Sequence, residues 1–338
     1  MADRVLLHVG AMKSGTSFIQ STLAANRAVL RRQDVLFPGE TWRDQVNGVV
    51  DVLGHGRDGA KPATAVGAWA RLVDEIAAWP GTAVISMEFL GATPVADIKR
   101  VVESLRPANV EVVLTVRDLA RTIPAMWQEE IQNGATWRWE EFLHAVEHGN
   151  PEIKGPSRQF WRQQRTALIA RRWAETVGRE NFTLVTVPPP GAPPEVLLDR
   201  FCEVLGVETT DFAPPRRRNP SIGVASALVV RALNERLGDG TLPRARYNQL
   251  VKTTLAKNGL AHRAASEPTA GFSARWVRRR SEQMIERFEK LGVRVVGDLG
   301  DLRPARVPGV NPSKVSERDQ LDAAIDGLVQ LVQVWPPS

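Results

Sequence analysis

The sequence predicts an α/β protein whose core is a mostly parallel β-sheet covered by helices. Short apolar runs alternate with stretches of helical periodicity, which is typical of β–α–β units. A glycine-bearing loop joins the first apolar run to the first helical stretch. Charged residues follow the carboxyl ends of several runs, where sheets of this kind bind their ligands.

The order of elements follows from these two periodicities. The expected strands are residues 5–9, 35–37, 83–86, 110–116 and 182–187, with a late strand-like run at 293–296. The expected helices are residues 16–32, 65–79, 95–106, 119–133 and 162–178. Because the glycine loop follows the first strand, that strand should lie in the centre of the sheet.

Two stretches depart from the alternation. Glycine, proline and tryptophan are frequent in residues 134–160, which contain one short helical piece at 140–146. Both a lid over the site and a structural insertion fit this pattern. From residue 221 onward the pattern is mostly helical. We therefore expect a single domain over 1–338, with 221–338 packed on the α/β core as a helical C-terminal region.

Composition narrows the class of protein. With 43% hydrophobic and 24% charged residues, the chain reads as an ordinary globular protein. No apolar run approaches the ~20 residues that cross a bilayer, and the N-terminus lacks a signal-peptide layout. Cys202 is the only cysteine, which excludes an internal disulfide. We expect a cytoplasmic protein, and the sequence gives no indication of its oligomeric state.

The net charge of +6 is compatible with an acidic partner. The sequence contains no recognisable nucleic-acid reader and no array of basic and aromatic residues. A cofactor with several negative charges, or an acidic acceptor, therefore explains the charge better than nucleic acid does.

The loop after the first strand has the composition of a phosphate site. Gly10 and Gly15 let the backbone turn sharply and present N–H groups, and the following helix adds its unpaired N–H groups and dipole. Lys13 supplies a positive charge. The hydroxyl donors are Ser14, Thr16 and Ser17. An ordinary helix-capping turn with an exposed lysine is the alternative, but strand, glycines, lysine and helix onset agree on a phosphate site.

The spacing within this loop distinguishes two kinds of phosphate site. A nucleotide-kinase loop reads G-x-x-x-x-G-K-[ST], and here Thr16 stands where its lysine would be. The lysine comes three places earlier, and residues 13–17 read Lys-Ser-Gly-Thr-Ser. This order resembles the K-[ST]-G-T-[ST] loop of bacterial and other PAPS-dependent sulfotransferases. The resemblance implies that the loop holds the 5′-phosphosulfate of 3′-phosphoadenosine 5′-phosphosulfate (PAPS), within a three-layer, P-loop nucleotide-kinase-like domain.

A second resemblance lies at the end of the strand 110–116. Arg117 follows this strand and resembles the family's arginine for the 3′-phosphate, a role that suits the planar guanidinium fork. The family often places a serine eight residues later, where this chain has Ala125. Thr122 lies nearby in another register and is the candidate hydroxyl partner. The alternative is that Arg117 starts a helix and pairs with Asp118.

Arg216 and Arg218 belong to a basic stretch that resembles the late loop of the family, which closes over the 3′-phosphate. The stretch precedes a helical pattern. An exposed basic loop that caps this helix through Ser221 is the alternative interpretation.

Two glutamates are candidates for the base that takes a proton from the acceptor. Glu40 follows the second strand, 27 residues after Lys13, and carbohydrate sulfotransferases of the family place a catalytic glutamate similarly. Glu88 ends the third strand and could be the base or could orient the acceptor. A turn carboxylate is the alternative for Glu40. Lys13 and the N–H groups of the loop suit the other task, which is relief of the negative charge on the leaving phosphate.

The expected activity is transfer of the sulfuryl group from PAPS to a hydroxyl or amine of an unidentified small-molecule or carbohydrate acceptor. No metal is expected, because the histidines are scattered and the kinase-type hydroxyl for magnesium is out of register. A nucleotide kinase or ATPase, and a nucleotide-binding protein without turnover, are the competing interpretations.

Overall fold

The computed structural model describes residues 2–55, 61–214, 222–238 and 240–334. The described residues fall into two compact units, each built from three pieces of the chain. The first, here the sheet unit, comprises Met1–Asp118, Gln163–Arg218 and Arg279–Arg303. The second, here the helical unit, comprises Leu119–Arg162, Asn219–Arg278 and Pro304–Ser338. Whether the whole chain folds as a single domain stays a prediction.

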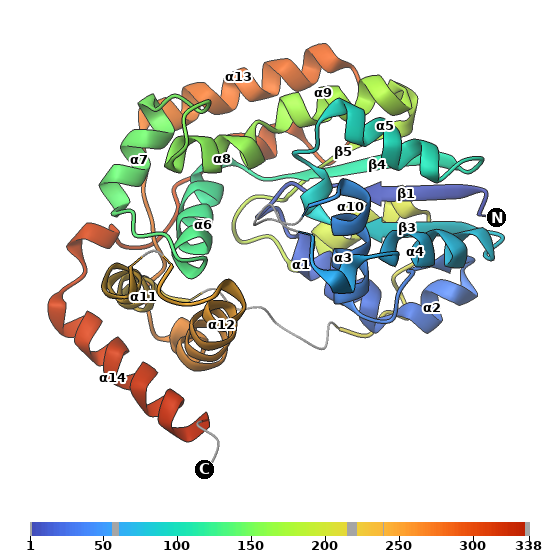
Figure 1. The fold of residues 1–338 in the computed structure, drawn as a ribbon. Helices are drawn as coiled ribbons and strands as arrows, with labels where there is room; N and C mark the ends of the chain where they lie inside the picture. The colour runs from blue at the N-terminus through green and yellow to red at the C-terminus, as the bar shows by residue number, and fades with distance from the viewer. Residues whose placement is uncertain (1, 56–60, 215–221, 239, 335–338) are drawn as a thin grey trace. The chain divides into compact units, whose positions relative to one another are not determined.

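The described part of the sheet unit holds one six-stranded sheet in the order β2-β3-β1-β4-β5-β6, with every pair parallel. Figure 1 labels β1, β3, β4 and β5 of this sheet. Its strands are β1 (Arg4–His8), β2 (Val35–Leu36), β3 (Thr82–Ser86), β4 (Asn109–Val116), β5 (Phe182–Thr186) and β6 (Arg294–Val296). The predicted α/β fold with a central parallel sheet is confirmed. β1 lies between β3 and β4, as the position of the glycine loop predicts.

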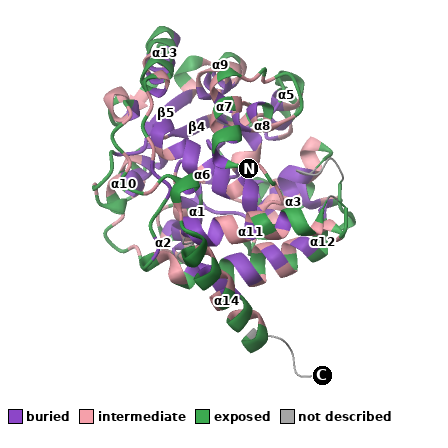
Figure 2. Cartoon of the chain, turned by 90° about the vertical axis from the view of Figure 1, so that its left-hand side faces the viewer, coloured by how far each residue is buried: buried purple, intermediate pink, exposed green. Residues whose placement is uncertain are grey.

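Helices cover both faces of this sheet. Alternate residues of β1 point to opposite faces, so Leu7 joins one buried apolar cluster and Leu6 joins another. The Leu7 cluster is completed by α3 (Trp42–Leu53), α4 (Ala68–Ala77), α5 (Val95–Ser104), α9 (Thr166–Val177) and much of α13 (Arg275–Leu291). The Leu6 cluster is completed by α1 (Thr16–Ala25), α2 (Arg27–Arg32) and α10 (Pro194–Leu205). Figure 2 shows β4 and β5 coloured as buried.

The predicted helix 16–32 is divided at Asn26. This buried side chain donates to the carbonyls of Thr22 and Ala213, at 2.8 and 2.9 Å, and accepts from the N–H group of Ala213 at 2.7 Å. A contact with a residue 187 positions away therefore separates α1 from α2. The predicted helix 162–178 is also divided, because Arg165 has a non-helical ψ of 57° between α8 (Pro156–Gln164) and α9.

The helical unit contains α6 (Leu119–Gln132), α7 (Trp139–His148), α11 (Val224–Leu237), α12 (Arg244–Tyr247) and α14 (Glu317–Val334), together with most of α8. A π-helical stretch (Asn248–Gly259) and a 3₁₀ stretch (Leu260–Ala265) follow α12. Within 134–160, Trp139 and Phe142 are buried, and the ring of Trp139 packs edge-on against that of Trp127. Whether this segment moves as a lid stays a prediction.

No helix among the described residues is long and apolar enough to span a membrane.

Candidate active site

The glycine loop leaves the carboxyl end of β1, and its backbone takes left-handed values at three positions. Gly10 has a φ of 111°, Lys13 of 64° and Gly15 of 87°. A positive φ is ordinary for glycine but uncommon for lysine, so the surrounding protein has to hold Lys13 in place. Consecutive N–H groups converge in such turns and form a concavity that suits an anion.

Hydrogen bonds to the loop carbonyls show how it is held. The carbonyls of residues 10–13 each accept a side-chain hydrogen bond. The donors are Thr115 to Gly10, Ser14 to Ala11, Gln164 to Met12 and Arg117 to Lys13, at 2.9, 2.5, 2.8 and 3.4 Å. Two N–H groups of the loop are bonded as well: that of Ala11 donates to the carbonyl of Thr115 at 2.6 Å, and that of Ser14 donates to the carbonyl of Ala11 at 3.4 Å. The loop is thus held through both its carbonyls and its N–H groups.

The hydroxyl of Ser14 faces the protein interior. Ser14 is 1% exposed, and besides its bond to Ala11 its oxygen lies 2.6 Å from the hydroxyl of Thr115. Thr16 is buried at the start of α1, and Ser17 is exposed. Their hydroxyls differ in accessibility, and a role in cofactor binding stays a prediction for all three residues.

His8 lies beneath the loop, fully buried in β1. Its Nδ1 is 2.7 Å from the hydroxyl of Ser86, and its Nε2 is 3.1 Å from that of Thr115. Both ring nitrogens of His8 are thus in hydrogen-bonding contact with a hydroxyl group, one from β3 and one from β4. Burial lowers the pKa of His8 to about 3, so the ring is neutral. His8 is thus a structural support of the loop.

Gly15 begins α1 in close contact with α10. A Cβ on Gly15 would lie 2.3 Å from a methyl carbon of Leu197, so the loop packs where only glycine fits without a shift. As the residue before α1, Gly15 has no side chain to cap the helix. The first N–H groups of α1 are therefore available for an anion.

Arg117 follows β4 and is half-buried. Its bond to the carbonyl of Lys13 places the predicted second anchor beside the predicted first one. Thr122 is buried in α6 of the helical unit. Arg216 and Arg218 lie outside the described residues. The 3′-phosphate roles of these residues stay predictions.

Glu88 lies directly against the loop. It follows β3 and begins the short 3₁₀ helix η2 (Glu88–Leu90). A Cβ on Gly10 would lie 3.2 Å from the Cβ of Glu88. On its other side, Oε2 of Glu88 accepts a hydrogen bond from Nε2 of Gln20 in α1, at 2.9 Å.

Glu40 lies in an exposed turn after β2. The preceding carbonyl, that of Gly39, accepts a hydrogen bond from Arg27 at 2.5 Å. The following residue, Thr41, caps α3 through Asp44. Because β3 lies between β2 and β1, the strand that carries Glu88 is the nearer one to the loop.

Two solved structures are similar to this chain. One is a sulfotransferase from Alicyclobacillus acidocaldarius, with 17% identity, a TM-score of 0.40, and coverage of 74% of this chain and 96% of that chain. The other is the sulfotransferase domain from the curacin biosynthetic pathway, with 12% identity, a TM-score of 0.36, and coverage of 79% and 97%. Neither the models of protein families nor the curated proteins gave a match. The chain is thus similar in structure to bacterial sulfotransferases at low sequence identity.

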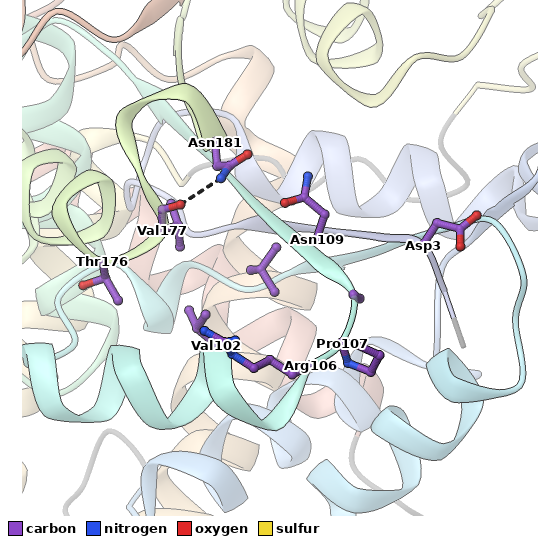
Figure 3. A pocket seen from close by; sticks show the side chains of 10 residues that line it. Asp3, Val102, Arg106, Pro107, Asn109, Thr176, Val177 and Asn181 are labelled. Atoms are coloured by element: carbon purple, nitrogen blue, oxygen red, sulfur yellow. Dashed lines mark hydrogen bonds between the residues drawn. The ribbon is translucent and has the colours of Figure 1, made fainter.

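A cavity of about 540 Å³ lies elsewhere on the sheet unit (Figure 3). Asp3, Arg106, Asn109, Thr176 and Asn181 are among the residues that line it. Asp3 precedes β1 and Asn109 begins β4, so this cavity opens at the amino ends of the strands. The glycine loop lies at the carboxyl ends, where parallel sheets bind ligands, so the loop is the better candidate for the site.

Sequence reasoning missed Gln20, Thr115 and Gln164. Gln20 and Gln164 are buried polar residues in helices, and Thr115 is a buried hydroxyl within a strand. A polar residue on an otherwise apolar face is a detectable signal, although it does not name the partner. Among the described residues, no group of three or more histidine, cysteine, aspartate or glutamate side chains could hold a metal ion.

Proposed function

We propose that this chain is a PAPS-dependent sulfotransferase that acts on a hydroxyl or amine of a carbohydrate or another small molecule. PAPS carries a 5′-phosphosulfate and a 3′-phosphate, so its site needs two separate anion anchors. The observation that carries the proposal is the contact of Arg117 with the carbonyl of Lys13, which puts a guanidinium beside the phosphate loop.

The loop supports the donor half of this assignment. Its carbonyls bond to the protein, it has left-handed turns at Lys13 and Gly15, and it leads into a helix N-terminus. These features favour a dense negative charge such as a phosphosulfate. Lys13 would stabilise the negative charge that develops on the 5′-phosphate as it leaves.

The proposed reaction is an in-line transfer. The acceptor oxygen or nitrogen attacks the sulfur, and the bond from sulfur to the bridging phosphate oxygen breaks. The proton of the acceptor goes to a carboxylate, with Glu40 and Glu88 as candidates. The products are the sulfated acceptor and 3′-phosphoadenosine 5′-phosphate (PAP).

A nucleotide kinase is the competing enzyme. It requires a lysine directly after the second loop glycine, where this chain has Thr16. A binding protein without turnover would share the loop, and only a reaction separates it from an enzyme.

Calorimetric titration with PAP, and with ATP in the presence and absence of magnesium, tests the nucleotide class. We expect PAP to bind more tightly than ATP and its binding to be independent of magnesium. Transfer from ³⁵S-labelled PAPS to a panel of monosaccharides, phenols and amines tests turnover. Magnesium-dependent preference for ATP would contradict the proposal, and so would tight PAP binding without transfer to any acceptor.

A further inference from the structure

Gln20 links the helix after the phosphate loop to the end of β3. It lies in α1 and is 5% exposed. Its Nε2 atom donates to the carbonyl of Ser86 at 3.0 Å and to Oε2 of Glu88 at 2.9 Å. The two N–H bonds of one amide are thus directed to the strand end and to the carboxylate that follows it.

Glu88 is constrained from two directions. Gln20 holds its carboxylate, and Gly10 packs so closely against it that a Cβ on Gly10 would lie only 3.2 Å from the Cβ of Glu88. One constraint comes from the loop itself and the other from α1, the helix that follows it. The position of the Glu88 carboxylate therefore depends on the position of the loop. Glu40, by contrast, is exposed and follows the edge strand β2.

We propose that Glu88 is the carboxylate that accepts the acceptor's proton, and that Gln20 is the positioning residue that holds it. This inference rests on the proposed function. A hydrogen bond from an immobilised amide restricts the rotation of the carboxylate. Fixed geometry of this kind is a large part of the advantage that an enzyme has over free reactants. The second oxygen, Oε1, is the atom assigned to the acceptor.

Gln45 provides a matched control. It lies in α3, is 1% exposed, and also bonds to Ser86: its Oε1 accepts from the Ser86 N–H group at 2.9 Å. Its Nε2 donates to the carbonyl of Pro38 at 3.0 Å. Replacing either glutamine with methionine removes two hydrogen bonds of one buried amide, but only Gln20→Met removes a bond to Glu88.

The first experiment measures the contact without any activity. A double-mutant cycle of Gln20→Met and Glu88→Ala is followed by urea unfolding of the full chain. We expect the changes in the unfolding equilibrium constant to be non-additive by roughly three- to tenfold, as for directly bonded side chains. The same cycle with Gln45→Met should be additive. Additive changes for Gln20 would overturn the link.

The second experiment measures turnover of ³⁵S-labelled PAPS with the acceptor that the wild-type protein uses best. Gln20→Met should lower kcat by about ten- to a hundredfold, in keeping with a misplaced catalytic group, and leave the affinity for PAP unchanged. Gln45→Met should lower kcat by less than about threefold. In a Glu88→Gln background, Gln20→Met should cause no further loss of kcat, because Gln20 acts by holding the Glu88 carboxylate, which this background lacks.

Two results would overturn this inference while leaving the proposed function intact. One is an undiminished effect of Gln20→Met in the Glu88→Gln background. The other is loss of turnover in Glu40→Gln with normal turnover in Glu88→Gln. A wild-type protein that transfers sulfate to no acceptor would instead refute the proposed function, and with it the role of Glu88 as the base. The double-mutant cycle followed by unfolding would still decide whether Gln20 holds Glu88.

Discussion

The guanidinium of Arg117 donates a hydrogen bond to the backbone carbonyl of Lys13, across 104 positions of sequence and 3.4 Å of space. The two residues that the sequence singles out as separate phosphate anchors are therefore in contact. A ligand that moves one of them would also move the other. Binding at the 5′ and 3′ ends of the nucleotide should accordingly be coupled.

Replacing Lys13 with alanine tests the donor site. Removal of one electrostatic group from a reacting centre costs ~10²–10³ in turnover. We expect Lys13→Ala to lower kcat by this factor and to weaken PAP binding much less. Single-turnover kinetics and calorimetry measure the two effects separately. A variant with near-normal kcat would exclude Lys13 from the reaction.

Arg117→Ala tests recognition of the 3′-phosphate. A charge-assisted contact contributes ~1.5–3 kcal/mol, so PAP should bind about ten- to a hundredfold more weakly. Adenosine 5′-phosphate, which lacks the 3′-phosphate, is the control ligand and should lose far less affinity. Equal losses for the two nucleotides would mean that Arg117 only supports the loop.

The two carboxylates are compared by isosteric substitution. Glu88→Gln keeps the shape of the side chain and removes its basicity, so turnover should fall by ~10²–10⁴. PAP affinity should be preserved. Glu40→Gln should retain most of the activity, since Glu40 lies in an exposed turn behind an edge strand. If both variants keep wild-type kcat, the base is neither residue.

His8 should make the folded protein sensitive to acid. Burial lowers the pKa of His8 from 6.5 to about 3. Between these values the unfolded chain binds a proton that the folded chain does not, so the free energy of unfolding falls as the pH falls below 6.5. Near pH 5 the loss should be about 2 kcal/mol relative to neutral pH.

His8→Gln is the control for this prediction, because the amide can donate and accept hydrogen bonds but does not titrate. Urea unfolding at several pH values should show a shallower dependence on pH in the variant, even where its stability is lower at every pH. Equal slopes for both proteins would assign the acid sensitivity to other groups.

Gly15→Ala should destabilise the protein. The added methyl group meets Leu197, and the φ of 87° is unfavourable for any residue with a Cβ. We expect a loss of ~1–3 kcal/mol in the free energy of unfolding. Gly206→Ala is a useful comparison, because its φ is also positive at 82° but no atom lies within 4 Å of its added carbon. If Gly15→Ala lowers the free energy of unfolding no more than Gly206→Ala does, the side chain of Leu197 can move aside without a loss of stability.

The strands β1 to β5 could be predicted because each contains a short apolar run that is buried on both faces of the sheet. Helix α3 was missed, and its interior contains Asn47 and Gly48, which have low helix propensity. Its N-terminus is instead stabilised by Thr41 and Asp44. The break between α1 and α2 at Asn26 could not be predicted either, because Ala213, which bonds to Asn26, lies 187 positions further along the chain.

In the candidate site too, features formed by residues close in sequence could be predicted, and contacts between residues far apart in sequence could not. The loop could be recognised from spacing alone, since glycines, lysine and hydroxyls lie within eight residues. The residues that hold the loop could not be predicted, because Gln164 and Thr115 lie 152 and 105 positions along the chain from the loop residues to which they bond. Preference for Glu88 over Glu40 likewise requires the strand order, which places β3 next to β1.

The interleaving of the two units bears on the order in which the chain can fold. The sixth strand, β6, begins at Arg294, more than a hundred residues after β5 ends at Thr186. During synthesis, the glycine loop and five strands therefore emerge long before β5 gains its outer neighbour. Until then the edge of β5 presents unpaired backbone groups, which are a template for pairing with another chain. A nascent or truncated chain that ends before Arg294 would carry most of the candidate site in a sheet whose β5 edge is open to pairing with another chain.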